Sequence, residues 1–210
     1  MDVPATTTTT KGDRTRQRIL EQAASLFNDR GYHAVTVGEL MASTGLQKGG
    51  IYNHFESREA LVLAAYDHNA DVLRSMVAVA LEGKRHAAER MHAIVGVFRD
   101  FANDPPYPGG CPTLNTSVES RGVDPRLHAR AQSVLTELLD DLFGRVAARG
   151  VERGELRADT DPQAVASVFV AAIEGALLLK EVLGDPSHMD RVAAHLDGYI
   201  DSLTPQETHE

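Results

Sequence analysis

The 210-residue sequence has a single cysteine, no tryptophan and no long apolar run. With Cys111 alone, no intrachain disulfide can form, and this favours a reducing, cytoplasmic setting. No stretch approaches the roughly 20 apolar residues that are needed to span a bilayer. The first residues, MDVPATTTTTKGD, also lack the apolar segment of a secretory signal. We therefore expect a cytoplasmic protein without a membrane partner.

Recognisable catalytic patterns are missing as well. The chain has no glycine-rich phosphate loop and no nucleophile elbow, and no nucleophile and base stand at a spacing that supports catalysis. None of its nine histidines groups with cysteine or paired carboxylates as metal ligands do. We expect no enzymatic activity, no metal and no cofactor. An enzyme that uses Cys111 with a distant histidine stays formally open, and turnover of any substrate would reveal it.

Positive charge is scarce overall but unevenly distributed. The formal net charge is −9, which by itself argues against a nucleic-acid partner, because a DNA-binding surface must neutralise phosphates. Residues 11–58 nevertheless carry a net charge of +2, whereas residues 59–210 carry −10. A mildly basic head on an acidic body can bind DNA in one orientation and repel it in others. Chance asymmetry would give the same numbers, so charge alone leaves the question open.

Apolar residues recur at helical spacing along nearly the whole chain, and alternating strand patterns are absent. The sequence therefore predicts an all-α protein. Caps and breakers place the expected helices at about residues 15–30, 36–44, 47–54, 58–82, 86–103, 111–121, 124–149, 162–183 and 188–203.

Three short helices within the first 60 residues have the spacing of a helix-turn-helix, in which the last helix lies in the major groove. Thr36 and Glu39 form a capping box, and Gly45 suits a tight turn. The candidate reading helix is Gln47–His54, with Ile51 and Phe55 as inward anchors. Two adjacent glycines, Gly49 and Gly50, are costly in a helix interior unless another backbone must come close.

The polar side chains of this segment, Gln47, Lys48, Tyr52, Asn53 and His54, suit phosphates and base edges. A polar, solvated helix face with flexible glycines is the plainer alternative. The stretch from Thr36 to Leu61, TVGELMASTGLQKGGIYNHFESREAL, closely resembles the DNA-binding domain of the tetracycline-repressor (TetR) family, and residues 14–35 fit the same pattern.

The resemblance implies specific roles in the head. Thr36, Lys48, Tyr52 and His54 would contact phosphates, and Arg58, where the family usually has lysine, would reach the DNA backbone. Gln47, Gly49, Gly50 and Asn53 would approach bases. Gln47 and Gly50 depart from the small and Thr- or Ala-like residues that are common there, which affects the operator sequence rather than the binding mode.

The resemblance also implies an N-terminal three-helix DNA-binding domain and a C-terminal helical domain for ligand binding and dimerisation. The expected boundaries are a disordered arm at 1–13, the helix-turn-helix domain at 14–58, the ligand-binding and dimerisation domain at 59–203, and a tail at 204–210. In this family the protein is a homodimer, and a small ligand in the body weakens DNA binding.

The last two helices are apolar over wide faces, which by itself is typical of an ordinary core. The resemblance makes them the dimer interface, with Val168, Ala172, Gly175, Ala176, Leu196, Tyr199 and Ile200 as candidates. For the ligand pocket, the candidates are Phe98, Phe101, Cys111, Leu114, Asn115, Val118, Glu119, Phe169 and Glu174. For each of these, an ordinary role in the protein core is the plainer interpretation.

Cys111 supports a separate hypothesis. It follows two glycines at an expected helix start, where the helix dipole lowers the pKa of a thiol.

The helix-turn-helix pattern and the family resemblance together predict a transcription regulator, a repressor that a small-molecule effector releases from palindromic double-stranded operator DNA. An electrophile- or oxidant-sensing regulator acting through Cys111 is the alternative. A helical interaction protein that has lost DNA binding is a third hypothesis.

Overall fold

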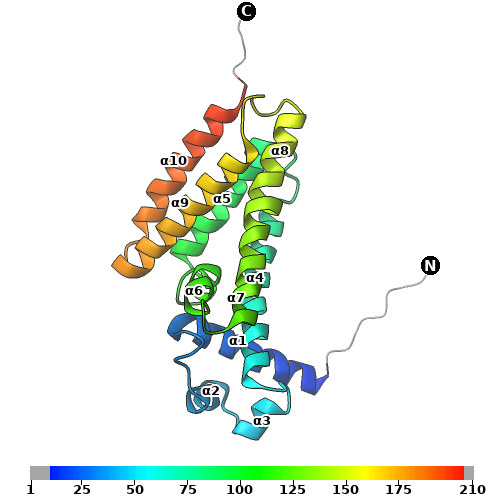
Figure 1. The fold of residues 1–210 in the computed structure, drawn as a ribbon, viewed down its shortest axis with the longest axis vertical. Helices are drawn as coiled ribbons and strands as arrows, with labels where there is room; N and C mark the ends of the chain where they lie inside the picture. The colour runs from blue at the N-terminus through cyan, green and yellow to red at the C-terminus, as the bar shows by residue number, and fades with distance from the viewer. Residues whose placement is uncertain (1–9, 206–210) are drawn as a thin grey trace, which may run out of the picture. The chain divides into compact units, whose positions relative to one another are not determined.

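In the computed structural model, residues 10–205 are described, and within them the chain is helical with no β-strand (Figure 1). This confirms the expected all-α class. No helix in this range is long and apolar enough to cross a membrane. The elements are α1 (Lys11–Arg30), α2 (Val37–Thr44), α3 (Lys48–Tyr52), α4 (Arg58–Ala80), α5 (Ala87–Asn103), α6 (Pro112–Glu119), α7 (Pro125–Thr136), the π-helical η1 (Glu137–Gly144), α8 (Arg145–Glu152), α9 (Pro162–Leu183) and α10 (Ser187–Leu203).

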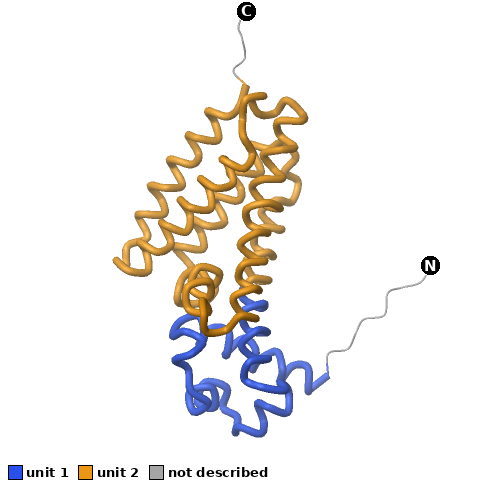
Figure 2. Tube along the Cα trace, viewed as in Figure 1, with its two compact units in different colours: residues 1–69 blue, residues 70–210 orange. Residues whose placement is uncertain are grey.

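The chain divides into two compact units between Asn69 and Ala70, inside α4 (Figure 2). The first unit holds α1, α2, α3 and the first turns of α4. The expected boundary at residues 58/59 comes earlier than this division, and Leu61 and Tyr66 of α4, which belong to the first unit, are buried. Asn69 is buried there too, and its amide donates to the Ala24 carbonyl of α1 at 3.1 Å.

The first helix begins earlier than the sequence predicted. Thr10 caps α1 by accepting a hydrogen bond from the Asp13 amide, while the Asp13 carboxylate accepts one from the Thr10 amide at 3.0 Å. Residues 11–13 are therefore helical, because the last threonine of the polar run finds an acidic partner three residues on. The rest of the expected arm, residues 1–9, and residues 206–210 of the expected tail lie outside the described range.

In the second unit, α9 packs against η1, α8, α5 and α10, and α10 packs against α5 (Figure 1). Its core is aliphatic and aromatic, with the Phe169 ring 4.9 Å from Phe143 and 6.0 Å from Tyr199 between ring centroids. Asp161 caps α9 through the Gln163 amide, and Gly184 ends it in the left-handed conformation at φ 67°. These ends fall where the Asp-Pro and Gly signals predicted them.

The sequence predicted one continuous helix over 124–149, but the structure interrupts it with the π-helical η1. Gly144 ends this segment, and a Cβ there would lie 2.8 Å from the Leu139 carbonyl oxygen and 3.9 Å from the Ala166 Cβ of α9. A glycine is thus needed where the widened turn meets α9. Short π-helical insertions of this kind are often found beside functional sites.

Candidate nucleic-acid interface

Helices α2 and α3 are joined by the turn that the sequence predicted. Thr44 donates its hydroxyl proton to the Leu40 carbonyl at 2.7 Å, and Gly45 takes a left-handed conformation at φ 68°. The Gly45 amide donates to the Met41 carbonyl at 3.0 Å. A side chain at positive φ would be strained, so glycine allows this conformation. The left-handed turn sets the direction in which the chain leads into α3.

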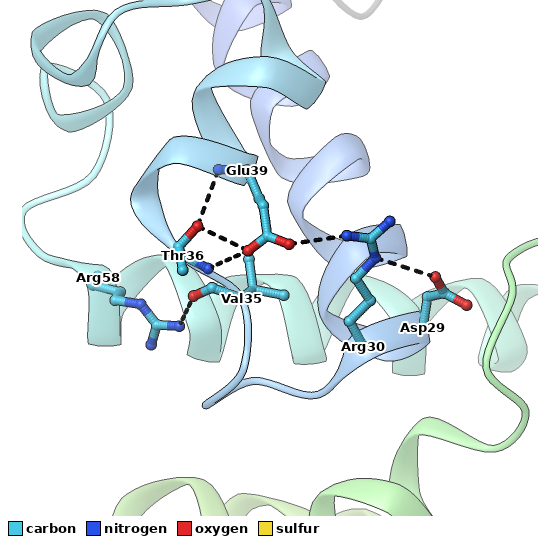
Figure 3. Close-up of polar contacts among 6 residues, drawn as sticks. All are labelled: Asp29, Arg30, Val35, Thr36, Glu39 and Arg58. Carbon is cyan, nitrogen blue, oxygen red and sulfur yellow. Dashed lines mark hydrogen bonds and ion pairs between the residues drawn. The ribbon is translucent and has the colours of Figure 1, made fainter.

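The start of α2 is held by a hydrogen-bond network around Glu39 (Figure 3). The Thr36 amide and hydroxyl donate to the Glu39 carboxylate at 2.7 and 2.8 Å, and the Glu39 amide donates back to the Thr36 hydroxyl at 3.2 Å. Arg30 donates to the other carboxylate oxygen at 2.9 Å. The bonds from Thr36, with a smaller effect of Arg30, lower the pKa of Glu39.

This network changes the expected role of Thr36. Its single hydroxyl proton is given to Glu39, so the Thr36 side chain caps the helix instead of presenting a donor to phosphate. The Glu39 amide is used by the same cap, so the amides of Val37 and Gly38 are the remaining donors of the first turn of α2. Sequence reasoning gave Arg30 no role, although a basic residue near a capping-box glutamate was the available signal.

Helix α3 presents the candidate reading surface. Gln47 is its N-cap, and Gln47, Lys48 and Gly49 are exposed. A Cβ built on Gly49 would meet nothing within 4 Å, whereas one on Gly50 would lie 3.5 Å from the Leu46 Cβ, an ordinary contact. No carboxylate pairs with Lys48 among residues 10–205. The outer side of α3 is therefore open, uncluttered and positive.

Two buried side chains anchor the end of α3 in the core of the first unit. Ile51 is fully buried and Phe55 is 6% exposed, as the sequence predicted. The Arg16 guanidinium of α1 stacks over the Phe55 ring at 4.8 Å from its centroid. Asn53 is exposed, while Tyr52 and His54 are half-buried. Of the expected contact residues, Gln47, Lys48, Gly49 and Asn53 are thus exposed to solvent, and their contact with DNA stays a prediction.

Arg58 differs from its expected role. Its Nη2 atom donates to the Tyr32 carbonyl at 2.5 Å and to the Val35 carbonyl at 2.7 Å, and its guanidinium lies 5.6 Å from the Phe27 ring centroid. The side chain is half-buried. It fastens the segment before α2 to the start of α4, so these contacts make it a residue that positions the reading surface.

In the second unit, the nine expected ligand residues differ widely in burial. Phe98, Phe101 and Phe169 are buried in the core, and Val118 is 65% exposed. Asn115 donates to the Gly109 carbonyl at 2.5 Å. Leu114 and Glu119 are half-buried. Three cavities in the described residues, of about 400, 360 and 210 Å³, include none of the nine in their walls.

The environment of Cys111 differs from that of a reactive thiol. The residue is 5% exposed, and its sulfhydryl donates to the Glu174 carboxylate, with Sγ 3.1 Å from Oε1. Burial, followed by the charge of Glu174, raises the pKa of the Cys111 thiol well above its ordinary value. The expected lowering by the helix dipole does not prevail, because desolvation and a neighbouring anion both disfavour the thiolate.

An apolar cleft of about 360 Å³ lies between α4 and the α7–η1 segment of the second unit. Leu73 and Val77 of α4 face Leu138 and Leu142 of η1 across it. The Arg74 guanidinium donates to the Glu137 carboxylate at its rim, with Nη2 2.6 Å from Oε2. The cleft combines apolar walls with one ion pair, which is typical of small-molecule sites.

The expected dimer residues fall into two groups. Ala176, Leu196 and Ile200 are at most 1% exposed and belong to the core of this subunit, so they are not available to a second copy. Tyr199 is half-buried. Val168 is 45% exposed, and Ala172 and Gly175 are half-buried on the same side of α9. Three residues that the sequence did not single out, Leu178, Leu179 and Val182, continue this surface with exposed fractions of 51%, 42% and 71%.

An all-α chain with a capped α2, a glycine turn and an open, positive α3 is a helix-turn-helix DNA-binding protein. Comparison with known families identifies it more closely. Residues 19–65 match the family described as bacterial regulatory proteins, tetR family, and residues 87–196 match the tetracyclin repressor-like C-terminal domain. The chain belongs to the TetR family of transcriptional regulators, which confirms the resemblance seen in the sequence.

Solved and curated relatives agree with this assignment. A TetR transcriptional regulator from Chloroflexus aurantiacus is 40% identical with a TM-score of 0.87, over 92% of this chain and 98% of that one. A TetR-family regulator from Cytophaga hutchinsonii is 29% identical with a TM-score of 0.83, over 94% and 98%. The transcriptional repressor AcnR from Corynebacterium glutamicum is 29% identical over 79% of this chain and 81% of its own.

Proposed function

We propose that the protein is a repressor that binds a palindromic operator as a homodimer and is released by a small-molecule effector. The observation that carries the DNA-binding part is the outer side of α3, where Lys48 is unpaired and Gly49 leaves open space. Two such helices in a dimer would read half-sites about 34–36 Å apart, one turn of DNA. Curated relatives include the repressors DhaR and AcnR, which supports repression.

Lys48→Ala should weaken operator binding in a salt-dependent way. The operator is first obtained by selecting bound sites from random DNA, and a palindrome is expected. Losing one phosphate contact per subunit removes counterion release, so the slope of log K against log salt should fall by about one unit per subunit. Fluorescence anisotropy across a salt series measures it.

The control for this measurement is Arg121→Ala, which removes an exposed cation from the second unit and should leave the slope unchanged. An equal fall in both variants would mean that the charge acts at long range and not at α3. A slope near zero in the unaltered protein would contradict DNA binding altogether and favour a protein-interaction role.

For the effector, we infer that the apolar cleft between α4 and η1 is the binding site. Its volume of about 360 Å³ falls in the range of small-molecule pockets, and the π-helical η1 forms one wall. A ligand that favours one packing of η1 shifts the population of conformations of the second unit, and this shift changes the affinity for the operator. By linkage, operator DNA must weaken effector binding by the same factor.

Leu138→Trp should abolish release by any compound that a library screen finds to dissociate the operator complex, because the indole fills a cleft that half-exposed Leu138 lines. Operator binding without compound should stay within about twofold, since the altered residue lies outside the DNA-binding unit. Anisotropy titrations of operator with compound measure both quantities.

Cys111→Ser separates this proposal from thiol sensing. The buried, carboxylate-bonded thiol is disfavoured as a nucleophile, so the serine variant should respond to the compound as the unaltered protein does. If Cys111→Ser abolished the response and Leu138→Trp preserved it, the cleft would be excluded and sensing through Cys111 favoured.

A further inference from the structure

The second unit contains a cavity of about 400 Å³ with an unusual concentration of positive charge. Its lining residues come from the α4–α5 connection, the start of α5, the end of η1, α8 and the segment after α8. Helix α8 packs against α5 (Figure 1). Six cationic side chains line it: Lys84, Arg85, Arg90, Arg145, Arg149 and Arg153. Only two carboxylates, Asp141 and Glu155, share the walls. This surface stands within a chain segment, residues 59–210, whose net charge is −10.

Both carboxylates already have partners. Asp141 forms an ion pair with Arg145. Glu155 accepts the Ala87 amide proton at 2.7 Å, and its other oxygen lies 3.5 Å from the His86 ring and 3.8 Å from the Arg153 guanidinium. Each carboxylate thus lies beside one cation of the walls, Asp141 beside Arg145 and Glu155 beside Arg153, so six cations against two carboxylates leave an excess of four positive charges.

Four of the cations form no ion pair. Across residues 10–205, no carboxylate lies within ion-pair distance of Lys84, Arg85, Arg90 or Arg149. The Arg90 guanidinium donates to the Lys84 carbonyl at 3.2 Å, which keeps it beside the same opening. Cations that converge on one hollow repel each other, and a bound anion relieves that repulsion.

Close helix packing lies beneath part of the cavity wall, where Gly150 and Ala87 both line the cavity. Gly150 of α8 is buried, and a Cβ there would lie 2.6 Å from the Ala87 Cβ and 2.8 Å from the Leu156 side chain. Glycine therefore allows α8 to approach the start of α5 closely. The cations of two separate segments are held around one concave space by this contact and by Glu155.

We propose that this cavity binds a phosphorylated small molecule that carries two or more phosphate groups. Guanidinium groups pair with phosphate oxygens through two parallel hydrogen bonds, and several of them around one hollow suit more than a single phosphate. A cavity of about 400 Å³ admits a ligand of nucleotide size. This site goes beyond operator binding and does not depend on it.

Isothermal titration calorimetry of the full chain, at constant ionic strength, tests the proposal with inorganic pyrophosphate, ATP and sulfate as probes. Pyrophosphate or ATP should bind once per chain and at least about tenfold more tightly than sulfate, because several cations can be engaged together. Tighter binding of ATP than of pyrophosphate would assign the rest of the cavity to the organic part of the ligand. Equal binding would assign the site to the diphosphate alone.

The variant Lys84→Gln/Arg149→Gln should weaken binding of the preferred probe at least about tenfold, since it removes two unpaired cations and no contact that holds the fold. The control Arg121→Gln/Arg126→Gln makes the same charge change outside the cavity and should stay within about twofold. Equal losses in both variants, or no preference over sulfate, would overturn the proposal. The proposal would also be overturned if Lys84→Gln/Arg149→Gln kept pyrophosphate and ATP binding but lost affinity for a 20-base-pair duplex of random sequence. That result would mean that the cations of the cavity contact DNA.

Discussion

Gly49→Glu should abolish operator binding while leaving the protein folded. The position is exposed and has a helical backbone conformation, and a Cβ there meets no atom within 4 Å, so the fold should accept a side chain. On DNA, the same side chain would occupy the space between α3 and the duplex and would bring a negative charge toward phosphates. We expect a loss of at least about 100-fold in operator affinity, as for the removal of several specific contacts.

Gly49→Ala should change the stability of the protein and its operator affinity in opposite directions. Replacing a helical glycine with alanine should raise the free energy of unfolding by about 0.5–1 kcal/mol. Operator affinity should fall nonetheless, because the added methyl group stands where DNA must approach. Urea unfolding and anisotropy measure the two quantities on one preparation.

Gly96 of α5 supplies the matched control, since a Cβ there also meets nothing within 4 Å. Gly96→Ala should stabilise the protein to a similar degree and leave operator affinity unaltered. If Gly49→Glu bound operator as well as the unaltered protein, α3 would not be the reading helix and the proposed interface would be wrong.

Much of the DNA-binding unit could be predicted from sequence because its signals are local. The capping box at Thr36, the glycine turn and the buried pair Ile51 and Phe55 depend on residues at most a few positions apart, and the structure shows each of them. Arg58 could not be predicted in the same way. Its contacts with the Tyr32 and Val35 carbonyls span more than 20 residues of chain, and the family resemblance implied a contact with the DNA backbone instead.

The second unit was less predictable for physical reasons. A π-helical segment depends on how η1 meets α9, and helical periodicity carries no sign of it. Apolar lining and apolar core have the same composition, so Phe98 and Phe169 were as plausible around a ligand as Leu73 and Leu138. The basic cavity was not predicted because Lys84 and Arg149 are 65 positions apart and only the fold brings their segments together.

The proposed dimer surface was also only partly predictable from the sequence. Helix α9 is apolar nearly all round, so the sequence did not indicate which side faces the subunit core and which faces outward. The structure places Ala176 and Leu177 inside and leaves Val168, Leu178, Leu179 and Val182 exposed. These four recur at helical spacing on one side, together with Ala172 and Gly175, which allow close approach of another helix. An exposed apolar surface of this kind marks an interaction site.

Leu178→Glu/Val182→Glu should therefore convert the proposed dimer to monomers. Both side chains are more than half exposed in the single subunit, so the substitutions leave its core intact, but they place two charges per copy in an apolar contact. Each monomer would retain an intact DNA-binding unit but could engage only one half-site. Operator affinity should fall at least about 100-fold, because the second half-site no longer adds its free energy to the same complex.

Light scattering after size-exclusion chromatography measures the mass, and anisotropy measures binding to a whole operator and to a half-site. The control Val79→Glu/Val123→Glu alters two valines with exposed fractions of 66% and 63% that lie outside α9, and it should stay dimeric. For the α9 variant, half-site affinity should match that of the unaltered protein, because α3 is untouched. A variant that remained dimeric would move the interface away from this side of α9, and loss of half-site binding as well would show that the substitutions act on folding rather than on assembly.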